Sequence, residues 1–295
     1  MPELVAGASS PAVATGAAGR AGLRQLVATR YVTALREGGS VPALVEADDG
    51  ALYIVKFRKA AQGLPALVAE LIIGQLGRAT GLPVPELALI EVDAALGRSE
   101  PHQEIRELLL GSAGLNLAMT YLAGSVGYDA AARAPVSGEF ASAVVAFDAY
   151  SANVDRTARN PNLLWWQGAL WLIDHGAALY WHHGYDVSSP ESDLLASARR
   201  PFTRVREHAL LPFADRLPAA GTALAAALDD RVIDGAVATV PDEWLVPDGR
   251  LPGGPGDAAP DGHRLRRAYA TWLRERRSAL PAIIEEADRV RAAGL

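Results

Sequence analysis

The chain has 295 residues, half of them hydrophobic, which is enough to bury one large core or two moderate ones. It contains no cysteine, which excludes disulfides, zinc–thiolate sites, iron–sulfur clusters and cysteine nucleophiles. The formal net charge of −6 provides no general basic surface, so nucleic acid is not expected as the main partner.

The first twenty residues, 1–20, are rich in Ala, Gly and Ser and are expected to form a flexible tail. Glu3 comes before any basic residue, and the first basic residue is Arg20, so the charged start of a secretory signal is missing. No stretch is apolar over the length that a bilayer span requires. We therefore expect a cytoplasmic protein with no membrane partner.

Three short runs rich in β-branched and aromatic residues follow the tail. They cover residues 30–37, 41–47 and 51–57, and the turn-forming segments GGS and DDG separate them. Short alternating runs between such turns are typical of strands joined by tight turns. This pattern predicts a three-stranded antiparallel meander.

A helix and two further strands are expected next. An apolar stripe at helical spacing predicts a helix over residues 64–81. Strands are predicted over residues 85–92 and 115–122, with a second helix over residues 101–110 between them. Five strands and an intercalated helix predict a small N-terminal lobe with an antiparallel sheet over residues 21–122.

Helical periodicity dominates the remainder of the chain, residues 123–295. It begins with an apolar helix over residues 138–154, and an apolar hairpin is predicted over residues 163–174. The Pro- and Gly-rich residues 247–262 are expected to form a mobile loop. The whole pattern predicts an α+β fold of two lobes, whose second lobe is larger and mostly helical, with a cleft between them.

Two charged residues stand out inside the apolar elements of the predicted N-terminal lobe. Lys56 is the lone cation of its strand, and Glu70 is the sole acid of the following helix. An ion pair between them would hold the lysine against the phosphates of a nucleotide. Taken singly, Lys56 could be an edge-strand lysine and Glu70 could face solvent.

Polar residues also lie at both ends of the predicted hairpin. Asn160 follows Asp155 by five positions, and Asp174 follows Asn160 by fourteen. Oxygen ligands at the two ends of one hairpin could converge on Mg²⁺, and Asn162 is a rival for Asn160, so the choice of amide stays open. Asp174 follows a strongly apolar run and would need a compensating cation if buried. Asp155 and Arg156, in contrast, could form an ordinary surface ion pair.

In order and spacing, these segments resemble the HipA-like kinase family, a bacterial branch of the protein-kinase-like fold related to phosphoinositide lipid kinases and aminoglycoside phosphotransferases. The segments are LYIVKF, AELIIGQLGRATGLPVPE, NVDRTARNPNLL and LWLIDHGAAL, and the resemblance covers residues 30–179, with VPDEWL further along. The resemblance implies a two-lobed kinase-like fold and a phosphotransferase that uses ATP and Mg²⁺. Asn153 departs from the pattern, because eukaryotic kinases have a histidine at this position.

Site residues follow from the same resemblance. Asp155 would be the catalytic-loop aspartate, and Asn160 and Asp174 would bind the metal. Lys56 and Glu70 would form the pair that fixes the α- and β-phosphates.

Further nucleotide contacts are expected from two backbone segments. Gly38, Gly39 and Ser40 would be the glycine loop over the phosphates, although EGGS is much shorter than a full kinase glycine loop. Tyr121 and Leu122, in the linker after Met119, would offer backbone groups to the adenine.

The acceptor is open at this point. The resemblance favours a serine or threonine of a protein, and residues 186–193 carry hydroxyls that could be autophosphorylated. A small molecule or biosynthetic intermediate is the alternative acceptor, because related phosphotransferases act on metabolite alcohols. The thin glycine loop also motivates a third possibility, an inactive nucleotide-binding module.

Two other features have simpler interpretations. His175, His182, His183 and Asp186 lack metal-ligand spacing, because adjacent residues of an extended segment face opposite sides. The basic run over residues 264–277 is typical of a solvated helix face, and could also bind an acidic partner.

Overall fold

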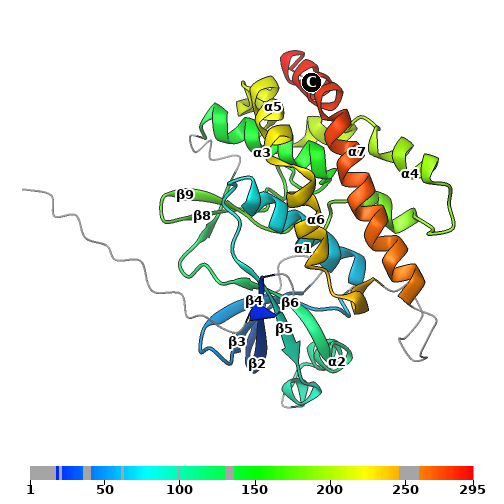
Figure 1. Ribbon diagram of the computed structural model, residues 1–295. Coiled ribbons are helices and arrows are strands. Elements are labelled where there is room, and N and C mark those ends of the chain that lie inside the picture. Colours follow the sequence, from blue (N-terminus) through cyan, green and yellow to red (C-terminus); the bar gives the residue numbers. More distant parts are fainter. Residues whose placement is uncertain are drawn as a thin grey trace, which may run out of the picture.

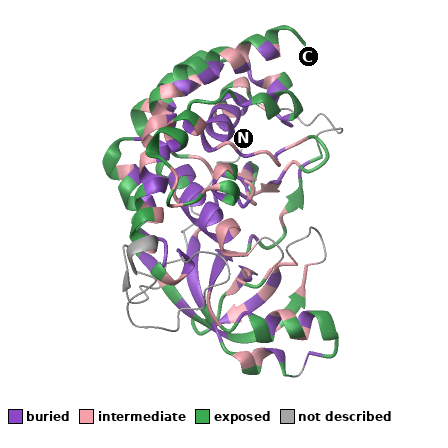
Figure 2. Cartoon of the chain, turned by 90° about the vertical axis from the view of Figure 1, so that its right-hand side faces the viewer, coloured by how far each residue is buried: buried purple, intermediate pink, exposed green. Residues whose placement is uncertain are grey.

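The structure is a computed structural model that describes residues 18–19, 22–35, 41–60, 63–98, 100–129, 136–245 and 259–294. A strand-rich N-terminal part and a helical C-terminal part lie on either side of helix α1 (Gly63–Ala79) (Figure 1). Buried residues concentrate at the centre of the molecule and exposed residues cover the outer helix faces (Figure 2). None of the helices in these ranges has the length and apolar character to cross a bilayer.

The N-terminal part is a closed β-barrel. Its strands are β1 (Ala18–Gly19), β2 (Leu23–Ala34), β3 (Ala43–Ala47), β4 (Leu52–Lys56), β5 (Leu87–Val92) and β6 (Gly114–Thr120). β2, β3, β4, β6 and β5 are hydrogen-bonded in that order, and β5 pairs back with β2 to close a ring of five strands. The β2–β5 pairing is parallel, so the prediction of an antiparallel sheet is wrong for this pair.

The length of β2 explains the closure. This strand has 12 residues; residues 24–27 pair with β5 and residues 28–34 pair with β3. The sequence pattern predicts a strand only over residues 30–37, so the first half of β2, residues 23–29, lies outside the predicted strand. One strand with two neighbours along its length can join both edges of a small sheet, which removes the exposed edges.

Three predicted segments lie largely outside the described residues, namely the tail over residues 1–20, the glycine loop and the loop over residues 247–262. Gly38, Gly39 and Ser40 are among them, so the structure says nothing of the predicted glycine loop. Most of the predicted tail, residues 1–20, is also outside. Within the predicted tail, Ala18–Gly19 is paired with β2.

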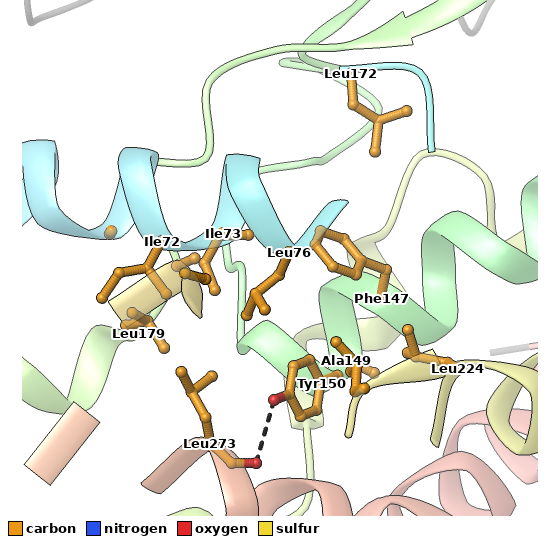
Figure 3. Close-up of a cluster of buried hydrophobic side chains, with 14 of the residues drawn as sticks. Ile72, Ile73, Leu76, Phe147, Ala149, Tyr150, Leu172, Leu179, Leu224 and Leu273 are labelled. Carbon is orange, nitrogen blue, oxygen red and sulfur yellow. Dashed lines mark hydrogen bonds between the residues drawn. The ribbon is translucent and has the colours of Figure 1, made fainter. Parts of the chain in front are cut away.

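Helix α1 joins the barrel to the helical part because it is apolar on almost all sides. Ten of its residues are buried, from Leu67 to Gly77. Gly74 allows close approach to the barrel, since a Cβ there would lie 2.5 Å from Leu87 Cδ1. On another side, Ile72, Ile73 and Leu76 point to a layer that contains Tyr150, Leu179 and Leu273 (Figure 3).

The predicted hairpin is present and belongs to a three-stranded sheet. β8 (Leu163–Trp166) and β9 (Ala169–Leu172) turn at Gln167 and Gly168, both of which have positive φ, as a tight two-residue hairpin turn requires. The third strand, β7 (Val126–Gly127), pairs with β8 and is too short for a sequence pattern to indicate.

The other regular elements of the described chain are helices. α2 (Gln103–Gly111) lies between β5 and β6, and the C-terminal part contains α3 (Gly138–Ser151), α4 (Glu191–Ala198), α5 (Leu217–Ala227), α6 (Asp230–Ala238) and α7 (Ala259–Ala292), with the 3₁₀ helices η3 (Tyr180–Gly184) and η6 (Asp242–Trp244). The prediction of a loop over residues 247–262 is wrong for its last four residues, which begin α7. Pro260 does not prevent this, because proline is accepted in a first helical turn.

Arginines of α7 bind other parts of the protein, so the prediction of a solvated basic face is wrong for several of them. Arg266 pairs with Asp242 at 2.7 Å, and Arg274 contacts Asp230 and Asp234. Arg276 is buried and donates to the carbonyls of Ala149, Tyr150, Ala198 and Arg200, at the C-terminal ends of α3 and α4. A cation at helix C-termini is stabilised by the helix dipoles.

Candidate active site

Lys56 lies between two carboxylates that are distant in the sequence. Its Nζ is 2.8 Å from Glu70 Oε2 and 2.7 Å from Asp174 Oδ1. Val55 and Phe57 point into the barrel core, so strand alternation directs Lys56 outward towards α1. The ion pair expected between Lys56 and Glu70 is therefore formed, and the residue after the hairpin joins it.

The three charges differ in exposure. Glu70 is 2% exposed and Lys56 is 13% exposed, whereas the side chain of Asp174 is 41% exposed. Glu70 therefore does not face solvent, and its carboxylate also accepts the backbone N–H of His175. Of the three charged side chains, Asp174 has the largest exposed fraction, so its carboxylate is the one that an incoming ligand can reach most easily.

Electrostatics keeps Lys56 and Asp174 charged. Burial acts to lower the pKa of Lys56, but the charges of Glu70 and Asp174 outweigh it and raise that pKa. Burial acts to raise the pKa of Asp174, and Lys56 outweighs it, so the pKa of Asp174 is lowered. Burial raises the pKa of Glu70 against the opposing effect of Lys56. The ammonium of Lys56 thus pairs with two carboxylates, and only that of Glu70 is deeply buried.

The turn that carries Asp174 has an unusual backbone. Asp174 has φ +56°, a left-handed conformation that costs of order 1 kcal/mol for a residue other than glycine. Gly176 follows closely, and a Cβ there would lie 3.5 Å from Glu70 Oε2 and 3.6 Å from Asp174 Oδ1. Strained residues of this kind cluster at functional sites. The turn holds the Asp174 carboxylate beside the ion pair of Lys56 and Glu70.

Asp155 and two amides form the second element of the site. Asn160 Nδ2 donates to Asp155 Oδ2 at 2.7 Å, and Asn162 Nδ2 reaches the same oxygen at 3.3 Å. Burial raises the pKa of Asp155, and the charge of Asp174 raises it further. The structure therefore brings Asp155 into the electrostatic range of Asp174, at the other end of the hairpin.

The two amides have different environments. Asn160 is exposed, whereas Asn162 is 9% exposed and has φ +49°. The backbone carbonyl of Asn162 accepts the N–H of Ile173 at 3.0 Å, which ties the loop to the residue before Asp174. Asn162 is thus part of the frame of the loop, and Asn160 is the amide that a ligand can approach.

Tyr121 and Leu122 lie directly after β6, as expected for a linker. The N–H of Tyr121 donates to Leu52 O at 3.2 Å, and the carbonyl of Leu122 accepts from Ser125 at 3.0 Å. These two backbone groups are used within the chain. The prediction of adenine contacts at this linker can therefore apply only to Tyr121 C=O and Leu122 N–H.

Sequence reasoning missed a buried polar network beneath the site. Arg156 is 1% exposed and pairs with Asp148, not with Asp155 on the surface. Asp148 also accepts from His208 Nε2 at 3.0 Å and from Asn153 Nδ2 at 3.2 Å. The available signal was the acid within the apolar helical run VVAFDAY, since an acid at a core position needs a partner.

The histidines do not form a metal site in the described part of the chain. No group of three or more His, Cys, Asp or Glu side chains there is placed to hold an ion. The expectation that His182 and His183 lie in an extended segment is wrong, because both belong to the 3₁₀ helix η3. Their Nε2 atoms are 3.3 Å apart.

Residues 29–252 match the family model of HipA-like kinases, so the chain belongs to the HipA-like kinase family. This family membership supports a kinase-type phosphotransferase. Among solved structures, the crystal structure of the Helicobacter pylori proinflammatory kinase CtkA is similar, with a TM-score of 0.49 and 12% sequence identity over 90% of this chain and 98% of that chain. No curated protein matches the chain in sequence.

Proposed function

We propose that this protein is an ATP- and Mg²⁺-dependent kinase that transfers the γ-phosphate to a hydroxyl group, with a serine or threonine of a protein as the favoured acceptor. The single observation that supports this most is the position of Lys56 between Glu70 and Asp174. A buried acid holds the ammonium, and a more exposed acid lies directly beside it. This arrangement suits a lysine that binds phosphates next to a metal ligand.

The residues present fit Mg²⁺ in the chemistry of their donors. Asp174 and Asn160 offer a carboxylate and an amide oxygen, both accessible, and Mg²⁺ prefers oxygen ligands. A site with one or two carboxylates is typical of Mg²⁺ bound together with nucleotide phosphates. When bound, the ion neutralises charge on the transferred phosphoryl group.

Asp155 is the proposed catalytic aspartate. Its raised pKa and its hydrogen bonds from Asn160 and Asn162 suit a carboxylate that orients an acceptor hydroxyl and accepts its proton. Positioning carries most of the catalysis in phosphoryl transfer, because the transition state is loose.

The remaining nucleotide contacts complete the proposal. Lys56 and Glu70 fix the α- and β-phosphates, and the linker groups of Tyr121 and Leu122 recognise the adenine. The barrel part and the helical part act as the two lobes around the nucleotide. Gly38, Gly39 and Ser40 are proposed to cover the phosphates.

Two measurements test this function. Thermal denaturation with ATP, with and without Mg²⁺, measures metal-dependent binding, and intact-mass spectrometry after incubation with MgATP detects phosphate on the protein. We expect Asp174→Ala to lose the Mg²⁺-dependent stabilisation. We expect Asp155→Ala to keep it and to lose transfer by about 10²- to 10⁴-fold, the usual contribution of a positioned acid or base. Full transfer by Asp155→Ala would contradict the mechanism.

The fate of the phosphate, measured on proteins, on metabolite alcohols and as ATP hydrolysis, separates the alternative functions. A gain of phosphate on the protein or on an added protein supports the protein acceptor. Transfer only to metabolite alcohols supports a small-molecule kinase. ATP binding that requires Asp174 but gives no transfer and no hydrolysis supports an inactive nucleotide-binding module.

A further inference from the structure

Arg156 places a buried guanidinium between the two loops of the site. Its Nη1 donates to the carbonyl of Asn162 at 2.5 Å and to that of Ile173 at 3.3 Å. Its Nη2 lies 3.3 Å from His175 Nδ1. Asn162 belongs to the catalytic loop, whereas Ile173 and His175 flank Asp174. One side chain therefore contacts both segments that carry the proposed metal ligands.

We propose that Arg156 is a positioning residue that sets the separation of Asn160 and Asp174, and with it the affinity of the site for Mg²⁺. This inference rests on the proposed function. Arg156 does not touch the reacting groups. It acts through the backbone of Asn162 and Ile173, each of which lies within two residues of a proposed ligand.

Asp148 of helix α3 holds Arg156 in place. Arg156 Nε donates to Asp148 Oδ2 at 2.5 Å, and His208 Nε2 contacts the same oxygen at 3.0 Å. Both partners, against the effect of burial, lower the pKa of Asp148 to about 2. The carboxylate of α3 thus stays ionised, and the guanidinium is held at a defined position.

A second route leads from Asp148 to the catalytic loop. Asn153 Nδ2 donates to Asp148 Oδ1 at 3.2 Å, and Asn153 Oδ1 accepts the backbone N–H of Asp155 at 3.2 Å. Asp148 therefore orients Asp155 through Asn153 and the Asp174 turn through Arg156. This gives a physical role to Asn153, where eukaryotic kinases have a histidine.

A purely structural ion pair is the competing explanation, since breaking a buried pair destabilises any fold. Arg276 offers the matched control, because it is also a buried arginine but bonds carbonyls at the ends of α3 and α4. Lysine cannot reproduce the planar fork of five donors in either position. Arg156→Lys and Arg276→Lys should therefore both lower the melting temperature.

Metal dependence distinguishes the two arginines. The first measurement is the Mg²⁺ concentration that gives half of the thermal stabilisation by ATP. We expect it to rise about tenfold or more in Arg156→Lys, because residues that orient metal ligands commonly contribute 10- to 100-fold to affinity. It should stay within about threefold of the wild-type value in Arg276→Lys, where only overall stability changes.

The second measurement is turnover at saturating Mg²⁺. We expect kcat of Arg156→Lys to fall about 10²-fold with KM for ATP within about threefold, since a misplacement of about 1 Å can have this effect. Equal kcat and equal Mg²⁺ dependence in the two lysine variants, compared at temperatures where both are folded, would overturn the proposal.

Loss of transfer in the wild-type protein and loss of folding in Arg156→Lys have separate consequences for the proposal. A wild-type protein that binds MgATP but transfers no phosphate contradicts the proposed function, and the Mg²⁺ titration then tests the positioning role alone. If Arg156→Lys does not fold, His175→Phe replaces it, because phenylalanine keeps a ring and removes the Nδ1 that faces Arg156. A folded His175→Phe variant with wild-type Mg²⁺ dependence would overturn the proposal, and a rise of about threefold or more supports it.

Discussion

Lys56 and Asp174 are 118 positions apart in the chain, yet Lys56 Nζ lies 2.7 Å from Asp174 Oδ1. The same carboxylate is the proposed metal ligand. Before nucleotide binds, the ammonium thus supplies the positive charge that Asp174 needs, and Glu70 keeps the ammonium in place from the other side.

Replacement of Lys56 should therefore affect stability as well as function. Lys56→Met leaves Glu70 buried without its cation, which should lower the free energy of unfolding by about 3 kcal/mol. Urea unfolding measures this loss. The double variant Lys56→Met/Glu70→Gln should recover most of the stability, because the neutral amide no longer requires a cation, but it should not bind ATP. A double variant as unstable as Lys56→Met would contradict this explanation.

Replacement of Asn160 should affect Mg²⁺ binding, whereas replacement of Asn162 should affect the stability of the fold. Asn160→Ala should raise the Mg²⁺ requirement for ATP stabilisation about tenfold and change the melting temperature little, because Asn160 is exposed. Asn162→Ala should lower the melting temperature, since alanine is poorly suited to φ +49°. Thermal denaturation over a Mg²⁺ titration measures both. The reverse pattern would make Asn162 the metal ligand.

Two helical glycines should respond in opposite directions to alanine. Gly74→Ala should lower the free energy of unfolding by about 1 to 3 kcal/mol, because its Cβ would overlap Leu87 of the barrel. Gly235 in α6 has no neighbour within 4 Å of a Cβ, so Gly235→Ala should stabilise by about 0.5 to 1 kcal/mol. Chemical denaturation of both variants tests the contact of α1 with β5. Equal effects would show that this contact is not tight.

The stability should fall as the pH drops below about 6.5. Burial, with a smaller effect of His183, lowers the pKa of His182 to about 3. Between these values the unfolded chain binds a proton that the folded chain does not, so each such group costs up to about 1.4 kcal/mol per pH unit. Burial and Arg156 also lower the pKa of His175 to about 3, so it contributes with the same sign.

His182→Phe tests the share of His182 in this pH dependence. The variant loses the contact of His182 Nδ1 with Tyr269 Oη, 3.0 Å away, which changes the stability at every pH. Its slope between about pH 6.5 and pH 5 should nevertheless be smaller than in the wild type, because one titrating group is gone. Urea unfolding at several pH values measures the slope. An unchanged slope would show that His182 is not held neutral.

Charged residues within otherwise apolar strands and helices could be identified from the sequence. Lys56 in an apolar strand, Glu70 in an apolar helix and Asp174 after an apolar run each predict a buried or half-buried charge, and such charges need each other. The strands β3 to β6 and the hairpin also agree with their patterns, because alternation and turn residues are local signals.

Features that depend on distant partners could not be predicted in this way. The closing pair of β2 and β5 is parallel, and no local pattern specifies which strand a long strand meets. Arg156 follows Asp155 directly, which suggested a surface pair. The actual partner of Arg156 is Asp148 on α3. The sequence shows that Arg156 is charged, but it does not show the direction in which its side chain points. Tertiary packing decides both cases.

Arg276 has a consequence for the order in which the protein can mature. This residue of α7 binds the last carbonyls of α3, immediately before the catalytic loop, and it is translated more than a hundred positions after them. A ribosome-bound chain that has exposed only the barrel, α3 and the hairpin therefore lacks the side chain that anchors the end of α3. These hydrogen bonds at the end of α3 form only after α7 has emerged and docked, so the C-terminal end of α3 is completed later than the hairpin.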